Sequence, residues 1–446
     1  MFSRQKFTHR YSVSFFYIYP MKNLFTAFTL LMLSPLSAQF KINIDAPESF
    51  TAKEALVYTL NGSKDVLYNA EVRKGNGWQI NFTKPYNGMM KLYFPDGNSS
   101  LNFIAENKDV HLKLLTDKNK VSDVQYLDDS NIIMNNLQEL QQKKEYILPA
   151  LYQIKEYYKG ESGFGGALTG EITRLTNANS DAGNHPFIQF YRTNYARFIQ
   201  KDATKKAVTH DDIISFLKTA PSMLESSSLM RPVLVAYMNI GDRTNVATDI
   251  DRLLKEVDTK TSRGQTVLAE LIYIFEMYDM QQLKEKYLVD ALAVKSPNDR
   301  LAAAITSNKN TQVGSIFPNY QFRRASGTTA KSIHDVKANQ KVIIFWASTC
   351  SHCEAELPKI VQQYNAFKGK GVEVIALSLD NEKEAYEKKI KELPWINDTE
   401  LRGWNSSSAE LYNVHATPTY FILDSANKII AKPEHAADVI TYFKLK

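Results

Sequence analysis

The only two cysteines of this 446-residue chain stand three positions apart, as Cys350 and Cys353, at the end of an apolar run. The run, KVIIFWAS, reads as a buried strand, and we expect a helix from the cysteines to about Lys368. A strand that leads directly into Cys-x-x-Cys places the first cysteine at a helix N-terminus. There the unpaired backbone N–H groups and the helix dipole favour the thiolate, the nucleophilic form of cysteine. Cys350 is therefore expected to attack, and Cys353 to resolve the mixed disulfide.

Two other roles for the cysteine pair fit the sequence less well. A structural disulfide normally closes a longer loop, because its stabilising effect grows with the length of the loop. A metal site could use the two thiolates, His352 and Glu356 to hold copper or zinc. No second cysteine pair or histidine cluster accompanies them, since His334 and His415 are isolated in the sequence. We expect no metal, and no cofactor other than a redox-active disulfide between the two cysteines.

Residues 312–446 resemble a thioredoxin-fold domain of the TlpA and ResA type. The resemblance is carried by a strand ending Phe345-Trp346-Ala347, the Cys350–Cys353 pair, Pro358 five residues later, and Thr417-Pro418 before a late strand. It implies an α/β fold, a structural role for Pro358 in a kinked helix, and a cis peptide bond before Pro418; an ordinary trans turn is the alternative. It also implies that Trp346, Thr417 and Pro418 contact the substrate, with the Thr417 backbone pairing with an extended polypeptide.

Two residues beside the cysteines carry further expectations. Glu356 matches a glutamate that the TlpA and ResA group uses near its second cysteine, which implies a role in deprotonating Cys353; a solvated helix glutamate is the alternative. His352 departs from the family pattern, because these sites mostly have proline there and oxidising members of the fold have histidine. An imidazole near Cys350 would stabilise the thiolate and raise the reduction potential above the value of about −270 mV typical of thioredoxin.

The rest of the chain divides into two regions by its pattern. Residues 40–126 are short β-prone runs separated by turn signals such as Asn61-Gly62, which is typical of a small β-sandwich. Residues 127–311 space apolar residues at three and four, which predicts an all-α domain. Within it, the glycines of GESGFGGALTG predict a flexible loop. The expected fold is multidomain, and its order resembles secreted Bacteroidetes proteins in which a small β-domain precedes a redox domain.

Residues 1–39 have the order of a secretory signal. From Met21, one lysine precedes an apolar run, and small residues follow as far as Ala38. We expect Met21 to be the true start of translation. An uncleaved membrane anchor is the alternative, although the run is shorter than the roughly 20 apolar residues of a permanent span. The expected location is periplasmic or otherwise extracytoplasmic, where a lone cysteine pair should rest as a disulfide.

The distribution of charge bears on partners. The net charge of +6 is spread along the chain without a long Lys/Arg block, which argues against nucleic-acid binding. The sequence predicts an extracytoplasmic thiol–disulfide oxidoreductase that acts on cysteine-containing client proteins and exchanges electrons with a redox partner in the envelope. The β and helical domains would position a partner protein or form a homo-oligomer. The alternative is a binding or scaffold protein whose thioredoxin fold has little redox turnover.

Overall fold

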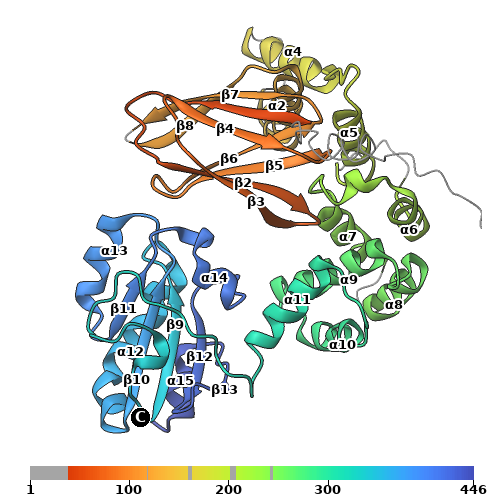
Figure 1. The fold of residues 1–446 in the computed structure, drawn as a ribbon. Coiled ribbons are helices and arrows are strands. Elements are labelled where there is room, and N and C mark those ends of the chain that lie inside the picture. Colours follow the sequence, from red (N-terminus) through yellow and green to blue (C-terminus); the bar gives the residue numbers. More distant parts are fainter. Residues whose placement is uncertain (1–38, 118, 159–162, 201–206, 242–244, 446) are drawn as a thin grey trace, which may run out of the picture.

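The structure is a computed structural model, and it describes residues 39–117, 119–158, 163–200, 207–241 and 245–445. The expected signal before residue 39, with its start at Met21, lies outside these ranges. Figure 1 shows a β-rich part at the top, an arc of helices at the right and an α/β part at the lower left. We name them the β region (residues 40–126), the helical region (127–311) and the thioredoxin-like domain (312–446). Within the described ranges, no helix combines the length and hydropathy that a membrane crossing demands.

In the described part of the β region, eight strands form two sheets, ordered β4-β1-β7-β8 and β3-β2-β5-β6. Along β1, Phe40, Ile42 and Ile44 are buried and alternate with more exposed residues, as expected when one face of a strand packs on a core. The inner faces of both sheets contribute to one apolar cluster. The strands are β1 (Phe40–Asp45), β2 (Glu54–Asn61), β3 (Lys64–Val72), β4 (Gly77–Phe82), β5 (Asn87–Phe94), β6 (Ser99–Glu106), β7 (Val110–Asp117) and β8 (Lys120–Tyr126).

The helical region packs its apolar faces into a single cluster of buried side chains. Its helices lie where apolar residues recur at three and four positions, which is the spacing of one helix face. They are α2 (Asp129–Gln142), η1 (Lys143–Ile147), α3 (Leu148–Tyr157), α4 (Gly163–Asn177), α5 (Pro186–Phe198), α6 (His210–Thr219), η2 (Ser222–Leu224), α7 (Met230–Met238), α8 (Val246–Val257), α9 (Ser262–Met277), α10 (Gln281–Leu292) and α11 (Asp299–Asn310).

The loop expected from the glycines of GESGFGGALTG is wrong over its described part, because α4 begins at Gly163. Leu168, Ile172 and Leu175 recur at three and four positions along α4, and all three are buried. Burial of this apolar face outweighs the low helix propensity of glycine, which costs about 1 kcal/mol per residue relative to alanine.

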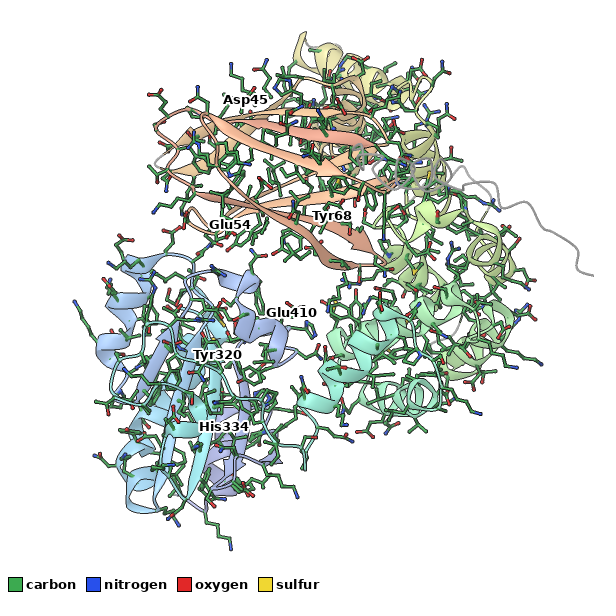
Figure 2. The ribbon with its side chains drawn as sticks, viewed as in Figure 1. Asp45, Glu54, Tyr68, Tyr320, His334 and Glu410 are labelled. Carbon is green, nitrogen blue, oxygen red and sulfur yellow. The ribbon has the colours of Figure 1, made fainter. Side chains whose placement is uncertain are left out.

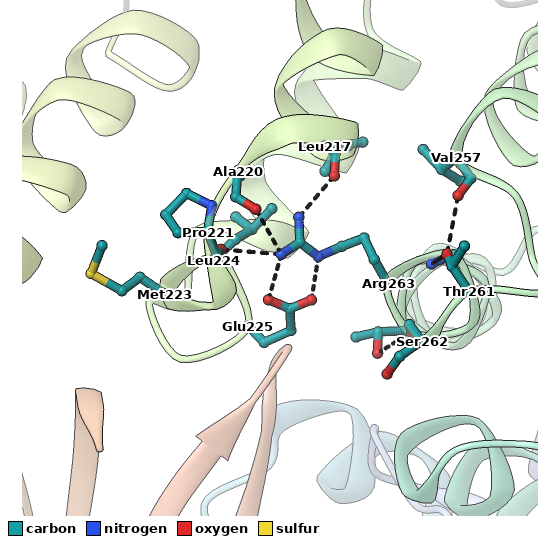
Figure 3. Close-up of polar contacts among 12 residues, drawn as sticks. Leu217, Ala220, Pro221, Met223, Leu224, Glu225, Val257, Thr261, Ser262 and Arg263 are labelled. Atoms are coloured by element: carbon teal, nitrogen blue, oxygen red, sulfur yellow. Dashed lines mark hydrogen bonds and ion pairs between the residues drawn. The ribbon is translucent and has the colours of Figure 1, made fainter. Parts of the chain in front are cut away.

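Arg263 on α9 connects α9 to the end of α6 and, through Glu225, to the β region. Its guanidinium forms a salt bridge with Glu225 and donates hydrogen bonds to the carbonyls of Leu217 (2.8 Å) and Ala220 (3.1 Å), as Figure 3 shows. These carbonyls lie at the C-terminal end of α6, where a helix leaves such groups unpaired. The carbonyl of Glu225 in turn accepts a hydrogen bond (2.7 Å) from the backbone N–H of Gly62 in the β2–β3 turn.

The β2–β3 turn also meets α9 at Glu270, whose side chain is fully buried. The Glu270 carboxylate pairs with Arg300 of α11 (2.8 Å) and Arg231 of α7 (3.6 Å), and accepts a hydrogen bond from the backbone N–H of Ser63 (2.9 Å). Gly62 has a φ of +69°, and a Cβ at this position would lie 2.5 Å from a Glu270 oxygen. Both the backbone conformation and the close approach therefore require glycine.

The thioredoxin-like domain is built on a five-stranded sheet ordered β11-β10-β9-β12-β13. Strands β9, β10 and β11 are parallel, and β12 is antiparallel to both of its neighbours. The elements are η4 (Ile333–Asp335), β9 (Gln340–Trp346), α12 (Ser351–Gly369), β10 (Val372–Ser378), α13 (Lys383–Lys389), η5 (Ile390–Glu392), β11 (Ile396–Thr399), η6 (Gly403–Asn405), α14 (Ser407–Leu411), β12 (Thr419–Asp424), β13 (Ile429–Ala431) and α15 (Ala436–Tyr442). The thioredoxin-like fold expected for residues 312–446 is confirmed, whereas the division of the remaining chain into separate domains stays a prediction.

One edge of this sheet faces the rest of the protein. The carboxyl ends of β9, β10 and β11 meet there, because parallel strands end on the same side. The antiparallel strand β12 begins at the same edge. The polar contacts across it join Lys120 to Glu382, Lys91 to Asn405 (2.9 Å), Lys64 to Glu410 (3.3 Å) and Asn413 to Glu276.

Candidate active site

Cys350 lies at the carboxyl end of β9 and is the N-cap residue of α12. Its sulfur accepts a hydrogen bond (3.2 Å) from the backbone N–H of Cys353, and its thiol donates one (3.2 Å) to the carbonyl of Thr417. Both cysteines are free thiols; Cys350 is half-buried and Cys353 is buried. The structure therefore confirms that the first cysteine lies at a helix N-terminus.

The two thiols differ in acidity. Burial acts to raise the pKa of Cys350. Hydrogen bonds from the side chains of Cys353 and Thr417, and from the backbone N–H groups of Cys353 and His352, outweigh it and lower that pKa below its ordinary value. For Cys353, burial and its hydrogen bond to Cys350 raise the pKa to about 12. The accessible sulfur is thus the one that ionises readily, and the buried one keeps its proton at neutral pH.

The segment before β12 forms the other wall of the site. The Thr417–Pro418 peptide bond is cis, as the resemblance implied. Both residues are half-buried, and the Thr417 carbonyl accepts the hydrogen bond from the Cys350 thiol. The structure therefore brings Thr417 and Pro418 against the cysteine pair from 67 positions away in the chain.

His352 and Pro358 occupy exposed positions on α12. The contribution of His352 to the lowered pKa of Cys350 comes from its backbone N–H. Pro358 stands inside α12, at the position expected of a structural proline. The effect predicted for the imidazole of His352 stays a prediction.

Glu356 is half-buried on α12 and engages both of its oxygens. One accepts a hydrogen bond from the Lys359 ammonium (2.6 Å) and the other from the backbone N–H of Ala436 (2.6 Å), at the start of α15. Burial acts to raise the pKa of Glu356, but these hydrogen bonds and the nearby positive charge lower it overall. Glu356 is therefore a carboxylate at neutral pH, tied to α15. Its predicted role in deprotonating Cys353 stays a prediction.

The expectation that Trp346 contacts the substrate is wrong. The side chain is 0% exposed and lies in the core on the α12 side of the sheet, with Ile344 and Cys353. Successive residues of a strand point to opposite faces, and β9 is covered on both, so its last residue is buried as well. Trp346 packs beside Tyr386, with ring centroids 6.2 Å apart, in the core below the cysteine pair.

Sequence reasoning missed Tyr420. It lies on β12 opposite Ile344 of β9, and its buried hydroxyl has no hydrogen-bond partner among the described residues. Burial and the negative charges of Glu356, Cys353 and Cys350 raise its pKa. The signal that could have found it is the alternation of a strand, which puts the second residue after Pro418 on the same face as that proline.

One family model matches the C-terminal part of the chain. Residues 313–432 match the model of the AhpC/TSA family. The thiol-disulfide oxidoreductase ResA of Oceanobacillus iheyensis is 32% identical over 123 residues, which cover 26% of this chain and 62% of that one. ResA of Bacillus cereus is 30% identical over 127 residues, which cover 27% of this chain and 69% of that one.

A solved structure is also similar to part of the chain. The thioredoxin domain of a thiol-disulfide oxidoreductase from Bacteroides vulgatus is 26% identical, with a TM-score of 0.28, and the match covers 30% of this chain and 96% of that one. The chain spans less than two thirds of the Oceanobacillus relative and just over two thirds of the Bacillus cereus relative. Through its C-terminal domain, the chain belongs to the thioredoxin-like family of ResA-type thiol–disulfide oxidoreductases.

Proposed function

We propose that the protein is an extracytoplasmic thiol–disulfide oxidoreductase that acts on protein cysteines through Cys350 and Cys353. The observation that carries the proposal is the asymmetry of the pair. A half-buried cysteine with a lowered pKa stands one helical turn from a buried cysteine whose pKa is raised to about 12. Exchange requires one sulfur that attacks as a thiolate and a second that holds its proton until the mixed disulfide has formed.

In the reducing direction, the Cys350 thiolate attacks one sulfur of a client disulfide. The client S–S bond breaks, and the leaving sulfur departs as a thiolate that takes up a proton from solvent. Cys353 then loses its proton and attacks the Cys350 sulfur, which releases the second client sulfur; this sulfur takes up a proton as well. Two electrons have passed to the client, and Cys350 and Cys353 share a disulfide. A partner dithiol protein in the envelope returns the pair to its reduced form, and the reverse steps oxidise a client dithiol.

Neighbouring residues have separate tasks in this proposal. Glu356 is ionised at neutral pH and stands three positions after Cys353 on α12, so it is in the right state to receive the proton of Cys353. The Thr417 carbonyl holds the Cys350 thiol in the reduced protein. Once Cys350 has lost its proton, this carbonyl is available to pair with the backbone of an extended client, beside Pro418.

The location rests on the sequence. The order of charge, apolar run and small residues from Met21 to Ala38 supports export, and a lone cysteine pair in an exported protein suits redox work. The proposal includes no metal or nucleic-acid partner and no cofactor besides the redox-active disulfide. In the described part of the chain, no group of three or more His, Cys, Asp and Glu side chains is placed to hold a metal ion.

Insulin reduction by dithiothreitol tests the proposal. The wild type should accelerate the precipitation of reduced insulin chains, and Cys350→Ser should leave only the uncatalysed rate. Cys353→Ser should accumulate a mixed disulfide with the client, because the resolving sulfur is absent. A wild type no faster than Cys350→Ser would leave the protein as a binding module with a thioredoxin-like fold.

A further inference from the structure

A cavity of about 460 Å³ lies where the thioredoxin-like domain meets the two other regions. Its lining includes Tyr58 of β2, Tyr273 of α9, Trp404 of η6 and His415 in the segment before β12. Figure 2 shows another lining residue, Glu410, on the side of the thioredoxin-like domain that faces the β and helical regions. The cavity therefore exists only in the full chain, because all three parts contribute walls.

The cavity lies close to the reacting sulfur. His415 lines it, and two positions later the Thr417 carbonyl is 3.2 Å from the Cys350 sulfur. Two residues of polypeptide span at most about 7 Å, so the cavity wall at His415 is within a short distance of the dithiol. Residues 415–417 therefore connect the cavity wall to the carbonyl that binds Cys350.

The charged side chains of the lining already have ion-pair partners. Each lysine, arginine, aspartate and glutamate among the described lining residues has an ion-pair partner of opposite charge. The pairs are Lys64 with Glu410 (3.3 Å), Lys91 with Asp65 (3.1 Å), Glu276 with Lys284 (2.9 Å), and both Arg231 (3.6 Å) and Arg300 (2.8 Å) with Glu270. A cationic ligand would lose its hydration without finding an unpaired carboxylate in return, whereas an uncharged one does not carry that cost. Arg231 and Arg300 share Glu270, which leaves one excess positive charge, and Arg231 already stacks on the Tyr273 ring.

The uncharged part of the lining suits a polypeptide. Trp404 is 56% exposed, so its indole is available to a ligand. Tyr273 is held in place between the Arg231 guanidinium, 4.0 Å from its ring centroid, and the His415 ring, 4.6 Å away and edge-on. Aromatic faces accept apolar side chains, and the amides of residues such as Asn405 can pair with backbone N–H and C=O groups.

We propose that this cavity binds an uncharged, apolar segment of the client polypeptide next to its reacting cysteine. The inference rests on the proposed function and adds a substrate class to it: clients whose cysteine is flanked by uncharged aromatic or aliphatic residues. Trp404 is the specificity-determining residue of the cavity. Small charged disulfides and clients with charged flanks react without this contribution.

Three chromogenic substrates with the same leaving group test the inference on the full-length reduced protein. Two are peptides of equal length whose cysteine carries a thionitrobenzoate disulfide, one with Leu, Phe and Asn flanks and one with Glu and Lys flanks. The third is the corresponding disulfide of 2-mercaptoethanol. The wild type should release the chromophore from the uncharged peptide about tenfold faster than from the charged one, as expected when one aromatic contact contributes to binding.

Trp404→Ala should abolish most of this preference, so that the two peptides react at similar rates. Tyr278→Ala is the matched control, because Tyr278 is 58% exposed and is not among the cavity-lining residues; it should keep the preference. Equal rates with the two peptides, faster reaction of the charged one, or a preference that survives in Trp404→Ala would overturn the inference. If the wild type reacts with no substrate faster than Cys350→Ser, the proposed function itself fails.

Discussion

At the scale of single residues, the acidity of Cys350 depends in part on the backbone of its neighbour. The N–H of His352 is one of the groups that lower the pKa of the Cys350 thiol. It is free to do so because the first N–H groups of a helix have no partner within the helix, and His352 is the second residue of α12. Histidine in place of the family's proline therefore supplies a hydrogen-bond donor as well as an imidazole, since proline has no backbone N–H.

The variants His352→Pro and His352→Ala separate these two contributions. Proline fits the first turn of a helix, so His352→Pro removes the N–H without breaking α12. We expect the alkylation rate of Cys350 at a pH below its pKa to fall by about tenfold in His352→Pro, as when one hydrogen bond to a charged group is lost. The reduction potential should fall with it, because the thiolate of the reduced form is less stabilised.

His352→Ala keeps the N–H, so any change in it reports the imidazole alone. The rate of alkylation by iodoacetamide across pH 4–9 and equilibration with glutathione are the two measurements. Because the thiolate fraction grows with pH, a raised pKa moves the alkylation profile to higher pH. Superimposable profiles for the proline and alanine variants would show that the N–H contributes nothing.

Tyr420→Phe tests the residue that sequence reasoning missed. Its hydroxyl is buried without a partner, so its removal should leave the free energy of unfolding unchanged or higher by about 1 kcal/mol. The hydroxyl also lies within the electrostatic influence of Cys353, so its dipole can stabilise the charge that forms when Cys353 loses its proton. We expect resolution of a mixed disulfide at Cys350 to slow by about tenfold or more. Stopped-flow mixing measures the rate of this step. Wild-type resolution in Tyr420→Phe would make the residue a packing residue only.

At the scale of elements, two strands at sheet edges, β3 and β8, show little of the apolar–polar alternation that marks a strand in a sequence. β3 and β8 end their sheets, and most of their side chains are exposed or half-buried. An edge strand need not alternate apolar and polar residues, because neither of its faces is strongly buried. The inner strand β1 was visible in the sequence for the opposite reason, since Phe40, Ile42 and Ile44 all face the core.

Glu270→Gln tests what holds the β2–β3 turn to α9. The change keeps the shape of the side chain but leaves Arg300, a buried cation, without its counter-charge. The free energy of unfolding should fall by about 3 kcal/mol in urea titrations. Glu256→Gln is the matched control, because Glu256 pairs with Lys218 (3.0 Å) on an exposed surface, and should change it by less than about 0.5 kcal/mol. Equal effects of the two changes would refute the role given to the buried pair.

At the scale of the whole molecule, Glu276 of α9 joins the helical region to the segment that carries the cis-proline. It accepts a hydrogen bond from Asn413, lies 3.8 Å from His415 and pairs with Lys284 (2.9 Å). The regions in front of the thioredoxin-like domain therefore contact the segment whose Thr417 carbonyl binds Cys350. A change at this junction can reach the dithiol through four residues of chain.

The contact of Glu276 with Asn413 and His415, called the junction here, should become less stable as the pH falls. Burial lowers the pKa of His415 below its ordinary value of 6.5; the Glu276 carboxylate opposes this shift, and Arg231 and Lys284 reinforce it. Below pH 6.5 an opened junction binds more protons than the closed one, so stability of the contact is present above that pH and is lost as the pH falls through the folded-state pKa.

Hydrogen exchange of the amides of residues 413–417, corrected for the intrinsic rate, measures this loosening. We expect protection to decrease between pH 7.5 and pH 5. His415→Asn should flatten this dependence, since asparagine does not titrate. Glu276→Gln should make the loss of protection below pH 6.5 larger, because removing the carboxylate lowers the pKa of His415 further and widens its difference from the opened state. A dependence that is the same in His415→Asn and the wild type would assign it to another group.

Local patterns were sufficient to place the cysteine pair and most elements. The strand before Cys350, the helix after it and the Thr417-Pro418 signal are each defined by residues close together in the chain, where periodicity and turn residues act. The burial of Trp346, the engagement of Glu356 by Ala436 and the place of Tyr420 beside Cys353 were settled by packing. These contacts, and the cavity between Tyr273 and Trp404, join residues that are far apart in the chain. They depend on tertiary packing, which produces no periodic pattern in the local sequence.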